Sequence, residues 1–263
     1  MTTKILVVSL LLSGVAVSAH AAGGADGWTG PYVGVDVGGA QTSSGGQEFC
    51  IDPSGAVQGP TCQVLPSGAS GAVSASGAYA GLHAGYNAAL GSAWVAGGEV
   101  DLGGGSISGT RTTNGPFPFA AFPGFATPAG VDRADLKIDG LDMIRGRLGY
   151  ALSDRWLAYA TGGVAFAHVK ASTTFTAPNV SVNYVGASSG LQTGWTAGGG
   201  LEAKLRGPWS GRIEVLYFDA GSQTVIGRPD NPGVPPIGVY QHNQTFDARG
   251  YMVTVGASYR FTR

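Results

Sequence analysis

Charge, cysteine and long apolar runs are all scarce in this sequence. Charged residues make up 12% of the 263 residues, against about 25% in a typical soluble domain. The formal net charge is −1, so no basic surplus is available to bind nucleic acid. No apolar run reaches the roughly 20 residues that a membrane-spanning helix needs. The low charge is typical of a membrane protein, yet a helical membrane protein is excluded.

The sequence also lacks the motifs that indicate an enzyme or a cofactor site. It contains no G-x-G-x-x-G, no P-loop and no H-E-x-x-H. The stretch 186–190 matches G-x-S-x-G, but a nucleophile elbow needs a strand before the serine and a helix after it. This stretch lies in a Gly/Ser-rich segment that precedes another strand. We therefore expect no enzymatic activity, no cofactor and no metal ion.

The first 21 residues have the features of a secretory signal peptide. Lys4 supplies the positive start, residues 5–17 form an apolar stretch too short to span a membrane, and Ala19-His20-Ala21 is an A-x-A cleavage site. We predict that residues 1–21 are removed and that residues 22–263 form the mature protein. Export would place the chain in an oxidising compartment.

The two cysteines, Cys50 and Cys62, lie 12 positions apart in a stretch rich in Gly, Pro and Ser. A zinc site would need more ligands at closer spacing. The spacing and the exported state therefore predict a disulfide within a loop, which would contribute about 3 kcal/mol on the chain-entropy estimate.

Glycine is abundant, at 46 residues, and apolar residues alternate with small or polar ones through much of the chain. This alternation predicts eight β-strands, each long enough for the roughly 9–11 residues of a tilted membrane strand. Their approximate ranges are 30–40, 77–89, 93–104, 138–150, 155–170, 191–205, 209–219 and 248–261.

The connections between these segments alternate in length. Three are short, and four are long, at about 41–76, 105–137, 171–190 and 220–247. Outer-membrane barrels combine short periplasmic turns with long extracellular loops. We therefore predict an all-β fold, an eight-stranded antiparallel transmembrane up-and-down β-barrel with both termini on the periplasmic side.

In six of these segments, ten charged residues fall on the face opposite the apolar one. A Lys or Arg at the lipid-facing midplane would cost about 2–4 kcal/mol, so these side chains must point into the barrel. Five acids and five bases balance there, and we expect Arg–carboxylate pairs across the lumen. The ten residues are Asp36, Glu99, Asp101, Arg145, Arg147, Glu202, Lys204, Arg212, Glu214 and Arg260.

The same charges allow a second interpretation, a charged ring that selects ions in a pore. Inward-facing glycines leave space in the lumen for long side chains or for water. The segment 155–170 is apolar on both faces, so its register stays open. Aromatic residues gather near the short turns and the C-terminus and predict a girdle at the periplasmic side. They are Tyr86, Trp94, Tyr150, Trp156, Trp209, Tyr259 and Phe261.

Several stretches carry a family resemblance. The opening 28–34 (WTGPYVG), the segment 145–150 (RGRLGY), the segment 194–202 (GWTAGGGLE) and the ending 255–261 (VGASYRF) resemble the porin-family outer-membrane proteins of the outer-membrane immunogenic protein type, an OmpA-like membrane barrel. The likeness extends over nearly the whole barrel but not over the long loops. It implies an integral barrel in the bacterial outer membrane, and no catalytic residue can be carried over from it.

The resemblance also implies partners. An outer-membrane barrel contacts outer-membrane lipid and lipopolysaccharide, and the barrel-assembly machinery reads a terminal aromatic signal, here Tyr259 and Phe261. Members of the family usually end on that Phe, whereas Thr262 and Arg263 follow it in this sequence.

Three functions remain open at this point. The leading one is a structural role in envelope integrity with loops displayed at the surface. The second is a small porin-like channel for ions or small hydrophilic solutes. The third is binding of a ligand or a host surface through the loops, which rests on the Pro- and Phe-rich segment 115–129 and on the Cys50/Cys62 loop.

Overall fold

The computed structural model describes residues 24–45, 47–51, 57–58, 72–115, 117–118, 126–127, 130–177, 182–230 and 241–261. The predicted signal peptide, Cys62 and most of the segment 115–129 lie outside these ranges. Within them, no helix is both long and apolar enough to cross a membrane.

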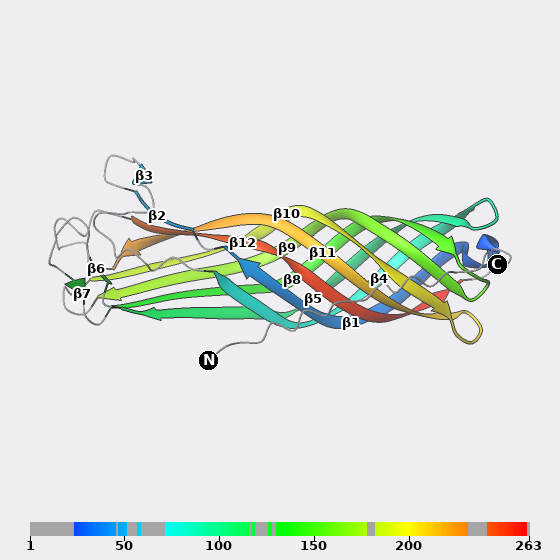
Figure 1. Cartoon of the computed structure of the whole chain (residues 1–263), viewed down its shortest axis with the longest axis horizontal. Helices are drawn as coiled ribbons and strands as arrows, with labels where there is room; N and C mark the ends of the chain where they lie inside the picture. The colour runs from blue at the N-terminus through cyan, green and yellow to red at the C-terminus, as the bar shows by residue number, and fades with distance from the viewer. Residues whose placement is uncertain are drawn as a thin grey trace.

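Eight long strands form a closed antiparallel barrel, which confirms the predicted fold (Figure 1). Each strand pairs with the next long strand along the chain, and the last pairs with the first through Tyr32 opposite Arg260. The strands are β1 (Gly30–Ser44), β4 (Val73–Leu90), β5 (Trp94–Asn114), β8 (Val131–Ala151), β9 (Trp156–Ala177), β10 (Val182–Lys204), β11 (Trp209–Pro229) and β12 (Gln241–Arg260).

The remaining elements are short. A 3-10 helix, η1 (Ala25–Trp28), precedes β1, and β2 (Gln47–Ile51) pairs with β12 at the far end of the barrel. β3 (Val57–Gln58) adds to β2, while β6 (Phe117–Pro118) and β7 (Ala126–Thr127) form a separate pair. The three tight turns gather at one end with η1 and the end of β12 (Figure 1), so this is the periplasmic end. Two of these turns use glycines with positive φ, Gly91 at 83° and Gly207 at 62°, a conformation that other residues adopt only with strain.

The strands continue well into the ranges predicted as long loops, and this corrects the predicted boundaries. β5 runs on to Asn114 and β8 begins at Val131, inside the predicted loop 105–137. The extensions of β9, β10, β11 and β12 likewise occupy much of 171–190 and 220–247, and β1 and β4 extend into 41–76. Their outward faces carry mostly Ser, Thr and charged residues, with only scattered apolar ones such as Val185 and Ile226, so hydrophobic alternation does not reveal them.

Besides a shift between Val185 and Trp195 of β10, where it pairs with β11, register shifts interrupt three strand pairs. They fall between Gly104 and Ile107 of β5, between Ile138 and Gly140 of β8, and between Asp219 and Ser222 of β11. A β-bulge inserts an extra residue and exchanges the two faces of the strand beyond it. On β8 the buried positions are odd-numbered up to Leu141 and even-numbered from Ile138 outward.

Between the bulges and the periplasmic end, an apolar band covers the outside of the barrel. Exposed Val, Leu, Ile and aromatic side chains alternate along every strand there, as lipid contact requires. On β12 the band runs from Phe261 to Tyr251, about ten residues, which at ~3.3 Å each and a ~40° tilt spans about 25 Å. The predicted periplasmic girdle is present, and Trp94–Tyr150 and Trp209–Tyr259 pack edge to face within it.

A second girdle, which the sequence analysis missed, marks the outer edge of the apolar band. Tyr217 packs against Trp195 on one side and against Tyr251 on the other, with ring centroids 5.2 and 5.1 Å apart. The long strands therefore cross the membrane between two aromatic rows and then continue outward beyond it.

Candidate functional site

The barrel interior holds the charged residues that the sequence placed there. The structure brings nine of the ten predicted lumen residues into one layer in the periplasmic half, the charged layer, and none of the nine is more than 6% exposed. Tyr32, His83 and Tyr159 complete it. The nine are Asp36, Glu99, Asp101, Arg145, Arg147, Glu202, Arg212, Glu214 and Arg260.

Arg145 of β8 is the central cation of the charged layer. It binds Asp101 of β5 through two hydrogen bonds of 2.9 Å and Glu99 through one of 2.7 Å. Its third nitrogen reaches Glu214 of β11, 2.8 Å away. One guanidinium therefore ties β5 and β8 to a strand that is not their neighbour. Such fork-shaped pairs are stronger and more specific than neutral hydrogen bonds.

Arg212 of β11 makes a second crossing. It binds both oxygens of Asp36 on β1, at 2.9 and 2.7 Å, and it reaches Glu99 at 2.7 Å. Glu99 therefore accepts from two arginines, and Tyr32 adds a third bond of 2.8 Å from its hydroxyl. Because every carboxylate is buried, each needs such partners to offset the loss of water.

A third group lies nearest the periplasmic end. Glu202 of β10 accepts from Arg147 at 2.8 Å, from Ser210 at 2.7 Å and from Arg260 at 3.1 Å. Arg147 also stacks on the ring of Tyr159, 3.9 Å from its centroid. This places the cation in an arrangement that aromatic rings stabilise.

Lys204, the tenth predicted residue, departs from the prediction. It is only partly buried, and its ammonium lies 4.8 Å from the centre of the Trp28 ring at the periplasmic mouth. It shares the inward face with Glu202 but stands at the last position of β10.

Trp28 closes the periplasmic mouth. It is fully buried, with Ala25, Val95, Ala151 and Leu157 packed around it. Arg260 donates a hydrogen bond to its carbonyl oxygen, which joins this seal to the charged layer. In the sequence, Trp28 was singled out only as part of the stretch 28–34, which carries the family resemblance.

A second layer, the apolar layer, fills the lumen next to the charged layer, on the side away from the periplasm. On opposite walls of the barrel, apolar residues follow the charged ones in the same way. On β8, Met143 and Leu141 follow Arg145, and on β11, Leu216 and Phe218 follow Glu214. The layer is a continuous cluster of buried residues that includes Tyr79, Ile107, Leu136, Ile138, Val169, Ala171, Val225, Phe246 and Met252.

Glycines of the inner wall make room for the largest side chains of the charged layer. A methyl group on Gly85 would collide with the Tyr32 ring and lie 2.6 Å from the carbonyl oxygen of Gly98. A methyl group on Gly34 would collide with the imidazole of His83. Because these glycines have no side chain, the rings of Tyr32 and His83 can lie directly against the wall at these two positions.

The register of β9, which the sequence left open, is now defined. Tyr159 faces the lumen and donates to Glu214 at 2.9 Å, while Val164 faces outward. A tyrosine on an otherwise apolar strand was the available signal, because a buried hydroxyl needs a partner.

His83 lies between an aspartate and a serine. Its Nδ1 is 2.6 Å from Asp36 and its Nε2 is 2.8 Å from the hydroxyl of Ser258. The order Ser–His–Asp is that of a hydrolase triad. Here Ser258 is 1% exposed and Asp36 is bound at both oxygens by Arg212. A substrate carbonyl cannot reach the serine, so the chain of bonds positions His83 within the wall.

The residues predicted as the assembly signal lie at the end of β12. Phe261 is 49% exposed on the lipid face, and its ring packs against Tyr259 at 5.1 Å. Cys50 lies in β2 opposite Gln58, and its predicted partner Cys62 lies outside the described residues. The disulfide therefore stays a prediction, as does recognition by the assembly machinery.

A closed antiparallel barrel with an apolar outer band, two aromatic girdles and a polar layer inside is an outer-membrane β-barrel protein. Residues 7–261 match the family of the outer membrane protein beta-barrel domain, and the chain belongs to this family. The protein is therefore integral to the bacterial outer membrane, as the resemblance implied.

The chain is also similar to curated relatives and to a solved structure. The chain is 28% identical over 202 residues to the 31 kDa outer-membrane immunogenic protein of Brucella melitensis, covering 76% of this chain and 74% of the relative. It is 33% identical over 102 residues to the 25 kDa outer-membrane immunogenic protein of Brucella ovis, covering 36% and 45%. The outer membrane protein OprG of Pseudomonas aeruginosa is similar at 16% identity and a TM-score of 0.49, covering 89% of this chain and 97% of OprG.

Proposed function

We propose that this protein is a structural component of the outer membrane, a barrel with a filled lumen that supports envelope integrity and displays its outer strands and loops at the cell surface. The observation that carries this proposal is the pair of stacked interior layers. The charged layer is no more than 6% exposed at any of its nine charged residues, and the apolar layer covers it from the outside.

The filled lumen favours this function over the alternative of a small channel. A conducting pore needs water along its whole length, or a gap that opens readily. Here the guanidinium groups are engaged by carboxylates from across the lumen, so opening would separate buried ion pairs. The apolar layer above them offers an ion little to replace its water, because Tyr79 is the one residue of that cluster with a hydroxyl group and none of the cluster is charged.

Single-channel recording in a planar bilayer tests this proposal directly. The protein must first be shown to be folded by the shift of its band on a gel when it is heated. We expect no steady openings from the folded wild-type protein. An open outer-membrane porin recorded in the same bilayer is the positive control and shows that the assay can detect an open lumen.

Reproducible openings of the wild type would overturn the structural proposal. Arg145→Gln would then separate the two ways in which that could happen. A changed ion selectivity would make the charged layer a selectivity filter, whereas an unchanged selectivity would place the pathway elsewhere.

The role in envelope integrity needs a cellular measurement. Cells that lack the protein should take up a large antibiotic or leak periplasmic protein more than cells that have it, and the wild-type chain should restore the barrier. The Ser258→Ala variant should restore it equally, because we assign no catalytic step to this serine. Failure of Ser258→Ala alone, with the barrel folded, would point to chemistry at the His83 site.

A further inference from the structure

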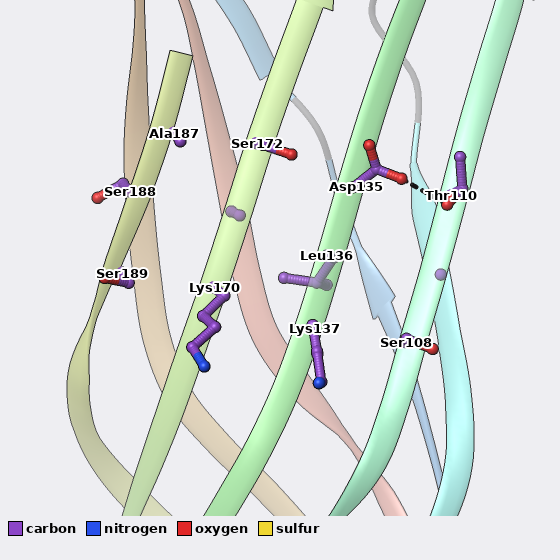
Figure 2. A pocket seen from close by; sticks show the side chains of 12 residues that line it. Ser108, Thr110, Asp135, Leu136, Lys137, Lys170, Ser172, Ala187, Ser188 and Ser189 are labelled. Carbon is purple, nitrogen blue, oxygen red and sulfur yellow. Dashed lines mark hydrogen bonds between the residues drawn. The ribbon is translucent and has the colours of Figure 1, made fainter.

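The outer wall of the barrel carries a depression of about 540 Å³ just beyond the apolar band (Figure 2). All its lining residues come from four adjacent strands, β5, β8, β9 and β10. A cavity inside the lumen would also be bordered by the opposite wall, so this one opens to the outside. Its polar lining consists of Ser108, Thr110, Asp135, Lys137, Lys170, Ser172, Ser188 and Ser189.

Two lysines face each other across neighbouring strands in this depression. Lys137 of β8 and Lys170 of β9 are direct cross-strand partners, and both are exposed. Side chains in this relation start about 4.5–5.5 Å apart, and like charges placed so close repel. An anion between them would turn that repulsion into attraction.

Of the two neighbouring carboxylates, Asp135 is engaged by residues other than the two lysines, and Asp139 is engaged by Lys170. Asp135 binds Arg133 through bonds of 2.9 and 3.0 Å and accepts from Thr110 at 2.6 Å. Asp139, the residue displaced by the β8 bulge, accepts from Lys170 at 2.7 Å and lies 2.8 Å from the ring of His168. Lys137 makes no ion pair with any described part of the chain, so its charge is uncompensated.

These bonds also fix the charge of the two aspartates. The hydrogen bond from Arg133 holds the pKa of Asp135 below its usual value, and the bond from Lys170 does the same for Asp139. Both are therefore ionised at neutral pH. Three cations stand against two anions around the depression, and the surplus lies at Lys137.

The position of the depression along the barrel axis determines which molecules can reach it. Leu191 of β10, 65% exposed, pairs with His168 just below the lysines, and Ile144 and Val164 continue the apolar band beneath it. A molecule seated here would have its polar end against lysines and hydroxyls, and its apolar end against the lipid-facing wall.

We propose that this depression binds the phosphorylated sugar headgroup of an outer-leaflet glycolipid. Lys137 and Lys170 bracket a phosphate, and the hydroxyls of Ser108, Ser172 and Ser189 bind the remaining phosphate and sugar oxygens. The acyl chains descend along the apolar band. The glycolipid is favoured over free phosphate because the lysines stand directly above that band.

Native mass spectrometry of the full barrel in detergent tests the proposal. The probes are bis-phosphorylated lipid A and the same lipid with both phosphates removed. Lys137→Gln combined with Lys170→Gln should weaken binding of the bis-phosphorylated lipid about tenfold and leave binding of the dephosphorylated lipid unchanged. Arg249→Gln removes an exposed cation of β12 that pairs with Asp247, and this control should bind like the wild type.

Three results would overturn the proposal. Equal binding by the double variant would show that the lysines do not recognise the headgroup. An equal loss for the dephosphorylated lipid would show that phosphate is not what they bind. Displacement of the bis-phosphorylated lipid by millimolar inorganic phosphate would identify a free-anion site. All variants must show the heat-dependent gel shift of the folded barrel.

Discussion

The charged and apolar layers of the lumen fill the same barrel by different means. In the charged layer, long side chains reach from one wall to another, and each bond has a direction and a partner. Arg145 joins β5 and β8 to β11, and Arg212 joins β11 to β1 and β5. In the apolar layer, shorter side chains fill space without preferred partners. The first therefore defines which strands stand opposite each other, and the second excludes water.

Substitutions in the two layers should also destabilise the barrel for different reasons. Loss of one partner in the charged layer leaves an unpaired buried charge, which is more costly than the interaction itself was worth. Loss of a side chain in the apolar layer leaves a cavity whose cost grows with its volume. The substitutions below separate these two kinds of damage.

The largest effect is expected from Arg145→Met. It leaves Asp101 and Glu214 without their closest cation, and the free energy of unfolding should fall by about 4 kcal/mol. Urea titration in lipid vesicles, read out by the heat-dependent gel shift, measures this. Arg155→Met, an exposed turn position, is the matched control and should change little. A fall below about 1 kcal/mol for Arg145→Met would mean that water enters and solvates the carboxylates.

Leu136→Ala tests the apolar layer. The side chain is 1% exposed, and its removal should lower the free energy of unfolding by about 3 kcal/mol, through lost burial and a cavity. The control is Leu102→Ala on the lipid face, 59% exposed, where lipid tails fill the space. Equal effects for the two leucines would show that the apolar layer is loosely packed.

Gly85→Ala tests how tightly the charged layer is fitted. The added methyl group would meet the Tyr32 ring, which must shift and disturb its bond to Glu99, at about 2 kcal/mol. Gly146→Ala serves as the comparison, because the nearest atom to its new methyl group is 3.9 Å away. An unchanged free energy of unfolding for Gly85→Ala would indicate that the space beside Tyr32 can accept a methyl group.

The smallest effect is expected from Tyr159→Phe. It removes the 2.9 Å bond to Glu214, but Arg145 still pairs with that carboxylate, so the loss should be about 1 kcal/mol. Unfolding of Tyr159→Phe in the Arg145→Met background measures the coupling between the two. A larger loss there than in the wild type would show that Tyr159 becomes the main support of Glu214.

Sequence reasoning predicted the membrane half of the barrel well for a physical reason. Lipid on one face and a packed lumen on the other impose a strict alternation, so charges such as Arg212 and Glu214 could be assigned to the inside. The choice of partners could not be derived, because Arg145 and Glu214 lie 69 positions apart on strands that are not neighbours.

The outer half was predicted less well, because water replaces lipid there. Ser108, Thr110 and Lys137 then occupy the outward face, and the bulge at Asp139 exchanges the two faces between Leu141 and Ile138. The apolar residues of this half therefore fell within a predicted loop. Lys204 was assigned to the correct face, but alternation does not show that it stands at the last position of β10, over the ring of Trp28.

The bulges give the wall two independent reading frames for side-chain alternation. Below them, odd positions of β8 point inward, and above them even positions do. Deleting Asp139 would remove the bulge and join the two frames into one regular alternation, because Leu141, Ile138 and Leu136 would then face the lumen at every second position. A one-residue insertion or deletion farther out on β8 would leave the frame within the membrane untouched. The extracellular part of the strands can thus change in length while the part in lipid keeps its register.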